Sequence, residues 1–309
     1  MKLVFRQSSH HLQSLTDNNC PAIFLKVFDQ PLILWNMSVA SKFQNIDKVM
    51  IPKEFPDALR LVQETFSSIK VEQFSDNGDY DTSSTFPNGN ENAPSPRNDE
   101  IEIPINSLAR YSKDTGKFLV ELLDYPWDFL RSTKKVLQEE VTQAVISPNA
   151  IIAKSSIIEG PCIIEDNVTI DDFCKIKGPV YLGKGSFVGM GSLVRGSMIG
   201  KNTRFGFNCE ISKCYFAGNT QIAHHNVILD STIGENVWFG GYSGTANVLL
   251  TRKNIKYMID DKLIDTGIDH FGAVVGNNCS VGAAVIILPG RQVPSNTQIQ
   301  AGTIYGKTG

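Results

Sequence analysis

Apolar side chains recur at every sixth position through the second half of the chain. The recurring residues are Ile146, Ile152, Ile158, Ile164, Ile170, Ile176, Leu182, Val188, Val194, Ile199, Phe205, Ile211, Phe216, Ile222, Ile228, Ile233, Phe239, Val275, Val281, Ile287, Val293 and Ile299. One residue drops out of the spacing before Ile199, Phe216 and Ile233. This period is neither helical nor that of a two-sided strand. It is typical of a triangular β-solenoid, in which each face contributes one inward aliphatic and three faces complete a coil of about 18 residues. We therefore predict a solenoid over residues 145–309.

The series is interrupted between residues 240 and 274. Solenoids tolerate insertions at their corners, and such excursions often carry functional residues on one face. The Lys and Asn content of this stretch favours a functional role, with a decorative loop as the alternative.

The first half has a different pattern. Short apolar runs at residues 3–5, 48–51 and 101–104 predict strands, and Pro31 begins a predicted helix. A second helix is predicted from Tyr125 to near Val141. Residues 75–100 are rich in Asp, Asn, Ser, Gly and Pro, which predicts a flexible loop. The first half is thus expected to be an α/β unit.

Charge and composition narrow the class of partner. With 29 basic and 32 acidic residues the net charge is -3, which argues against nucleic acid or an anionic membrane as the main partner. The N-terminus turns polar after five residues, and no apolar run approaches the roughly 20 residues of a membrane span. The six cysteines form no C-x-x-C pair and are expected to be reduced. These features predict a soluble, cytoplasmic protein.

Several segments of the second half carry a specific resemblance. They are residues 223–225 (AHH), 230–236 (DSTIGEN), 244–247 (GTAN), 253–256 (KNIK), 265–267 (DTG) and 272–276 (GAVVG). Together they resemble the bifunctional sugar-1-phosphate nucleotidylyltransferase/acetyltransferase family. The residues of these segments are most similar to those of its archaeal branch. The resemblance implies a left-handed parallel β-helix of hexapeptide repeats that transfers an acetyl group from acetyl-CoA to an amino-sugar phosphate.

The first half resembles the same family's nucleotidylyltransferase domain, with parts missing. Residues 15–18, 30–33 and 126–128 match segments of that domain, but residues 6–14 contain no glycine where the family has a phosphate-cradling G-x-G-T-R loop. We therefore predict a truncated nucleotidylyltransferase-like α/β domain over residues 1–128, without nucleotidyl transfer. A linking helix is expected over residues 129–144, and His10 and His11 are expected to be surface residues.

Acetyl transfer to an amine needs a base, and histidine is the natural one near neutral pH. The resemblance places His224 at the family's catalytic histidine and Asn247 at an asparagine beside the sugar and thioester. It implies that Arg195, Lys213, Lys253 and Lys256 bind phosphates, with ordinary solvated residues as the alternative for all four. For His224 the alternative is a His-His pair in a corner without a chemical role. If the local chain is extended, His225 points away from His224.

The resemblance also implies small residues along the acetyl-CoA arm. The predicted cofactor-binding residues are Gly241, Ala273, Gly282, Ala283 and Ala301. No metal is expected, and the family's site lies between neighbouring chains, so a homotrimer is predicted.

Three positions depart from the family's pattern and leave the identity of the acceptor sugar open: Val227, Tyr242 and His270.

Two other classes of protein remain open as well. A non-catalytic assembly or regulatory protein on the same scaffold would fail to bind acetyl-CoA. A trimeric zinc enzyme would need three converging histidines, and His224, His225 and His270 do not match the spacing of that family.

Overall fold

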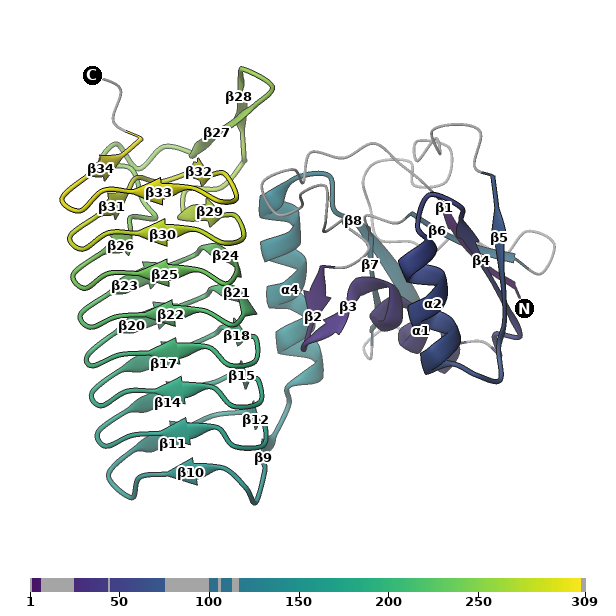
Figure 1. Cartoon of the computed structure of the whole chain (residues 1–309), viewed down its shortest axis with the longest axis horizontal. Coiled ribbons are helices and arrows are strands. Elements are labelled where there is room, and N and C mark those ends of the chain that lie inside the picture. Colours follow the sequence, from purple (N-terminus) through teal and green to yellow (C-terminus); the bar gives the residue numbers. More distant parts are fainter. Residues whose placement is uncertain are drawn as a thin grey trace. The chain divides into compact units, whose positions relative to one another are not determined.

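The computed structural model (Figure 1) describes residues 2–6, 25–43, 45–75, 100–104, 107–112 and 117–306. The chain divides into two compact units, with the boundary between Asp128 and Phe129. The predicted surface histidines His10 and His11, Cys20, the glycine-free residues 7–14, the family-like residues 15–18 and most of the predicted loop at 75–100 lie outside the described residues.

The first unit contains a four-stranded parallel sheet in the order β5-β4-β1-β6. Its strands are β1 (Lys2–Arg6), β4 (Lys48–Pro52), β5 (Lys70–Phe74) and β6 (Glu100–Pro104), and its helices are α1 (Leu32–Phe43) and α2 (Pro56–Thr65). The strands predicted at 3–5, 48–51 and 101–104 and the helix after Pro31 are confirmed. Two short antiparallel pairs complete the unit: β2 (Lys26–Val27) with β3 (Gln30–Pro31), and β7 (Ser107–Ser112) with β8 (Lys117–Leu122).

Helix α1 is fixed to the β7–β8 pair by buried polar groups. Trp35 Nε1 donates to the carbonyl oxygen of Ala109 at 2.7 Å, and Asn36 both donates to the Ser107 carbonyl and accepts from the Ala109 amide. Because each of these buried groups has a partner, the contact avoids the cost of an unsatisfied polar atom.

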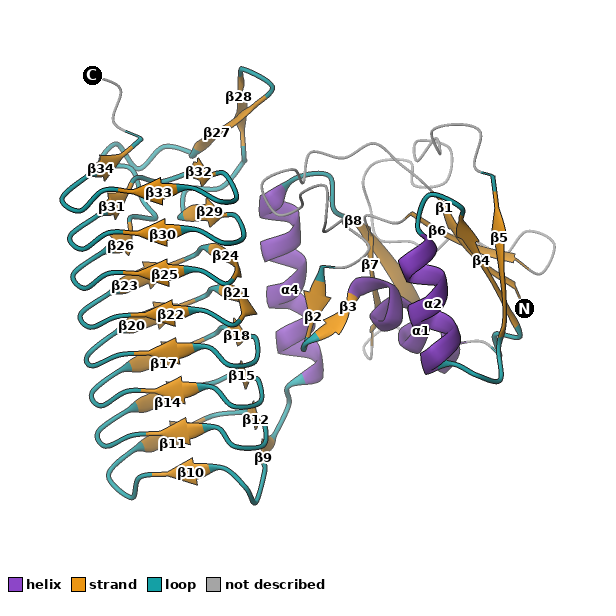
Figure 2. Cartoon of the chain, viewed as in Figure 1, coloured by secondary structure: helices purple, strands orange, loops and turns teal. Residues whose placement is uncertain are grey.

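The second unit forms the predicted left-handed parallel β-helix, with three sheets of eight strands that we call the first, second and third faces. The first face contains β9 (Ala144–Ile146), β12 (Cys162–Ile164), β15 (Val180–Leu182), β18 (Met198–Ile199), β21 (Tyr215–Gly218), β24 (Thr232–Glu235), β29 (Ala273–Val275) and β32 (Arg291–Val293). The second contains β10 (Ile151–Ile152), β13 (Thr169–Ile170), β16 (Phe187–Val188), β19 (Arg204–Phe205), β22 (Gln221–Ile222), β25 (Trp238–Phe239), β30 (Ser280–Val281) and β33 (Gln298–Ile299). The third contains β11 (Ile157–Glu159), β14 (Lys175–Lys177), β17 (Leu193–Arg195), β20 (Glu210–Ser212), β23 (Val227–Leu229), β26 (Gly244–Thr245), β31 (Ile286–Ile287) and β34 (Ile304–Tyr305). Figure 2 shows these short strands joined by turns, coil upon coil.

The predicted aliphatic series forms the solenoid core. Phe205 and Phe216 meet edge to face inside it, with ring centroids 5.3 Å apart. Ile146 is 42% exposed because no coil lies beneath the first one. The missing residues in the period are explained by shorter coils: Ile163 pairs with Tyr181, an offset of 18 (181 − 163), but Tyr181 pairs with Met198, an offset of 17 (198 − 181).

The excursion is shorter than the interruption predicted at 240–274. Gly240 to Ala246 belong to the solenoid, and Thr245 fills the inward position between Ile228 and Ile287. Its hydroxyl is hydrogen-bonded to Ser231 Oγ at 2.8 Å, so a polar residue is tolerated there. The chain leaves the solenoid over residues 247–272, called the excursion below, which contains the antiparallel pair β27 (Lys256–Ile259) and β28 (Lys262–Asp265).

The helix predicted from Tyr125 to near Val141 is confirmed as α4 (Pro126–Glu140). Phe129 on α4 meets Tyr215 on the first face edge to face, with ring centroids 4.8 Å apart. Tyr181, Met198 and Tyr215 point outward from that face, yet each is at most 3% exposed. Helix α4 therefore covers the first face.

The five described cysteines are buried and free of disulfides, as predicted. Burial raises the pKa of each of these thiols, that of Cys214 to about 12. A raised pKa keeps a thiol protonated and poorly nucleophilic. Among the described residues, no helix is long and apolar enough to cross a membrane.

Candidate active site

His224 lies in the corner between the second and third faces, two residues after β22. The backbone there is a turn and not the extended chain considered above: His225 has a positive φ of 58°. Backbone hydrogen bonds join this turn to the coils on both sides, from the His225 amide to the Phe207 carbonyl and from the Tyr242 amide to the His224 carbonyl. His224 is thus carried on a rigid part of the solenoid.

The imidazole of His224 lies against the preceding coil. Its Nδ1 accepts a hydrogen bond from the Phe207 amide at 2.9 Å. Gly206 makes this approach possible, because a Cβ there would lie 2.8 Å from Nδ1. With Nδ1 accepting, a neutral ring carries its proton on Nε2. The unprotonated nitrogen of His224 is therefore the one beside Gly206.

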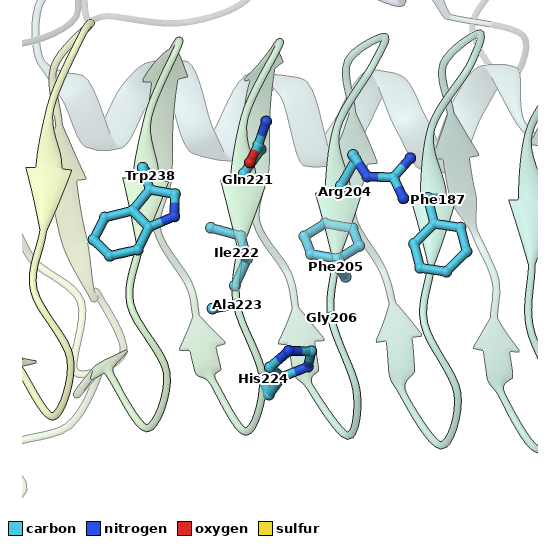
Figure 3. Close-up of a pocket in the computed structure, with 9 residues that line it drawn as sticks. All are labelled: Phe187, Arg204, Phe205, Gly206, Gln221, Ile222, Ala223, His224 and Trp238. Atoms are coloured by element: carbon cyan, nitrogen blue, oxygen red, sulfur yellow. The ribbon is translucent and has the colours of Figure 1, made fainter.

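A groove of about 310 Å³ runs along the second face, and His224 lines its side at the corner of the solenoid (Figure 3). Its polar and aromatic side chains come from successive strands: Phe187, Arg204, Gln221 and Trp238. The Arg204 guanidinium lies 4.5 Å from the centre of the Phe187 ring, a cation–π contact that orients it. Trp238 remains 45% exposed. The groove therefore combines an exposed indole, an oriented cation and an imidazole.

Three predicted cofactor residues lie in line with His224. Gly241, Ala283 and Ala301 occupy the same corner position on the following coils, as the amide-to-carbonyl bonds from Tyr242 to His224, from Ala284 to Gly241 and from Gly302 to Ala283 demonstrate. Gly282 lies beside them, but coil stacking alone requires it: a Cβ there would be 2.5 Å from the Ala301 nitrogen. Residues with small side chains therefore line this corner of the solenoid next to the imidazole.

Ala273 lies elsewhere. It begins β29 on the first face, is fully buried, and donates its amide to Ser231 Oγ at 2.9 Å. No surface of Ala273 is available to a ligand in the described chain.

Three other predicted residues, Arg195, Lys213 and Asn247, lie at another corner of the solenoid, between the third and first faces. Arg195 ends β17 and forms an exposed ion pair with Glu210 at 2.7 Å, and Lys213 occupies that corner with a φ of 56°. Asn247 follows β26, and its Nδ2 donates to Asp230 Oδ2 at 2.7 Å. A whole face separates these residues from His224 within one chain. Lys253 and Lys256 are exposed on the excursion.

The three departures from the family's pattern have distinct surroundings. Val227 is 43% exposed on the third face, and His270 Nδ1 lies 2.8 Å from Asp269 Oδ1 on the excursion. The Tyr242 ring stacks on His225 at 4.8 Å, and Phe207 meets the other side of that imidazole edge-on at 5.1 Å. Across the described ranges, no three His, Cys, Asp or Glu residues gather as a metal site.

Sequence reasoning missed Arg204 and Trp238. Each directly precedes an inward residue of the six-residue series, Phe205 and Phe239, and so points outward from the second face. The six-residue period identifies only inward positions, but an exposed tryptophan beside a core position is a signal that the sequence does contain.

Residues 161–196 match a family model described as bacterial transferase hexapeptide (six repeats). The match lies within the solenoid, from β12 to β17. Over 104 residues the chain is 30% identical to the putative uncharacterized acetyltransferase YaiX of Escherichia coli K12, covering 34% of this chain and 45% of that protein.

Two archaeal proteins are also similar. The bifunctional protein GlmU of Methanocaldococcus jannaschii is 33% identical over 107 residues, which cover 35% of this chain and 26% of the relative. The bifunctional sugar-1-phosphate nucleotidylyltransferase/acetyltransferase of Sulfurisphaera tokodaii is 28% identical over 110 residues, covering 36% and 27%. The chain thus spans less than half the length of each of these relatives.

Proposed function

We propose that this protein transfers the acetyl group of acetyl-CoA to the amine of an amino-sugar phosphate. The observation that carries the proposal is the position of His224, at the side of the groove and in line with Gly241, Ala283 and Ala301. Relatives named as an acetyltransferase and as a sugar-1-phosphate nucleotidylyltransferase/acetyltransferase support the same chemistry.

In this proposal His224 is the general base. In this step the imidazole turns away from the Phe207 amide, so that Nδ1, the nitrogen that carries no proton in the neutral ring, faces the acceptor amine in the groove. As the amine attacks the thioester, an N–C bond forms and the C–S bond breaks. The amine's proton passes to His224, which gives it to the leaving thiolate of CoA, so the neutral base is restored. No acyl-enzyme is involved.

The acceptor occupies the groove beside His224. The indole of Trp238 offers a flat apolar surface for a sugar ring, and Arg204 offers an oriented cation for its phosphate. Arg195, Lys213 and Asn247 contribute from a neighbouring chain of a homotrimer, because within one chain they lie a face away from His224. Lys253 and Lys256 of the excursion bind phosphate groups of either substrate.

Replacing Arg204 with methionine is expected to raise KM for a phosphorylated acceptor by about 10- to 100-fold, because a hydrogen-bonded charge contact is lost. Acetyl-CoA affinity should stay within about twofold. Lys154→Met, which removes an exposed cation from an earlier coil, is the matched control. Equal KM values in steady-state assays of the two variants would contradict the role of Arg204.

The function is tested first with the unmodified protein. Acetyl-CoA is titrated by calorimetry, and thiol release is then followed with glucosamine-1-phosphate and galactosamine-1-phosphate. Binding with turnover supports the proposal and ranks the acceptors. Binding without turnover points to another amino sugar, whereas no binding favours a non-catalytic assembly or regulatory protein. A parallel assay for uridylylation tests the proposed loss of nucleotidyl transfer, and any product would overturn it.

A further inference from the structure

The excursion has a narrow neck where it leaves the third face and returns to the first. Asn247 stands at the exit, and Phe271 and Gly272 stand at the return. The Phe271 amide donates to the Asn247 carbonyl at 2.9 Å, and the Gly272 amide donates to the Asp230 carbonyl at the same distance. A methyl group at Gly272 would overlap the Leu229 carbonyl oxygen and the Ser231 hydroxyl, so the neck is pressed against the coil that contains Asp230.

Asp230 contacts both sides of this neck. Its backbone carbonyl holds Gly272 at the return, and its carboxylate oxygen Oδ2 accepts from Asn247 Nδ2 at 2.7 Å at the exit. The residue is 5% exposed and has a positive φ of 43°, a conformation that Asp and Asn adopt more readily than most residues. One aspartate therefore closes the base of the excursion.

The second carboxylate oxygen of Asp230 is bound from helix α4. Lys134 Nζ lies 2.8 Å from Oδ1, and the two side chains are 30% and 6% exposed. A nearly buried carboxylate requires a partner of opposite charge, and removal of that partner is costly. Lys134 thus supplies the opposite charge that holds the Asp230 carboxylate in place.

The inner part of the excursion is packed and connects the neck to the lysines. Ile255 and Tyr257, which flank Lys256, are at most 1% exposed, and Tyr257 packs on Phe271 with ring centroids 5.9 Å apart. Ile255 also exchanges backbone hydrogen bonds with the returning strand, at Thr266 and Ile268. A shift of Phe271 therefore moves the segment that carries Lys253 and Lys256.

We propose that Lys134 and Asp230 are positioning residues, through which helix α4 fixes the neck of the excursion and the placement of its lysines. Asn247 then stabilises the neck as well as contacting the substrate, because its amide nitrogen donates a hydrogen bond to Asp230. The expected effect on KM rests on the acetyl transfer proposed above. The expected effect on hydrogen exchange at the neck does not depend on that function.

The test is Lys134→Met in the full chain. Hydrogen exchange at the Phe271 and Gly272 amides is expected to accelerate about tenfold or more, since the neck loses its charge-balanced anchor. KM for acetyl-CoA or the sugar phosphate should rise about tenfold while kcat changes less than about threefold. Lys134→Arg, which keeps the charge, should restore both. Lys175→Met, which breaks an exposed ion pair with Glu159 (2.7 Å), is the matched control and should change neither.

Unchanged exchange at the neck in Lys134→Met would overturn the inference, whatever the kinetics. If the unmodified protein transfers no acetyl group, the proposed function fails but the exchange measurement still decides the role of Lys134. Should Lys134→Met not fold, Asp230→Asn serves instead. It keeps the positive φ accessible and removes the ion pair, so faster exchange supports the inference and normal exchange contradicts it.

Discussion

Replacing His224 with alanine is expected to lower kcat for acetyl transfer by a factor of about 10² to 10⁴, the usual contribution of a general base. The imidazole is exposed at the side of the groove, so its loss removes the proton acceptor without opening the core. Acetyl-CoA binding should persist, because Gly241, Ala283 and Ala301 are unchanged. Thiol release and calorimetry on the same preparation separate the two effects.

The control is the neighbouring histidine. The His225 ring is held between Tyr242 and Phe207 and contacts Asn208, so it is committed to the corner itself. His225→Asn keeps a residue that tolerates the positive φ and is expected to leave kcat within a few fold, roughly. If His224→Ala acetylates as fast as the unmodified protein, His224 is not the base.

Replacing Phe205 with alanine is expected to reduce the free energy of unfolding by about 3–5 kcal/mol. The ring is fully buried and contacts Phe216 edge to face, and the stacked coils cannot collapse readily onto the space it leaves. Urea unfolding followed by circular dichroism measures the loss as a lower midpoint at an unchanged slope.

Phe207 offers a matched comparison on the same coil. Its side chain is 44% exposed and contacts the edge of His225, so Phe207→Ala should cost about 1 kcal/mol. Equal losses for the two substitutions would mean that the inward position does not carry the stability of the solenoid.

Much of the solenoid was predictable because its core contacts join residues at a constant separation along the chain. Each inward aliphatic packs on residues one coil away, so the requirement for an apolar side chain repeats with the coil and is written along the chain. Thr245 escaped detection because its hydroxyl is satisfied by Ser231, which lets a polar residue occupy an inward position. The interruption predicted at residues 240–274 therefore began too early, because Gly240 to Ala246 belong to the solenoid.

The sequence by itself determined the inward series, the helix after Tyr125 and the residue types around His224. Tertiary structure decided which of these residues meet. Coil stacking aligns His224 with Gly241, Ala283 and Ala301 and moves Ala273 into the core. The groove joins Arg204 to Trp238 because outward positions of different coils become neighbours only when the coils stack. Lys134 reaches Asp230 across 96 residues of chain, and no periodicity relates a helix to the corner of a solenoid. Such contacts depend on how separate elements pack, which local spacing does not encode.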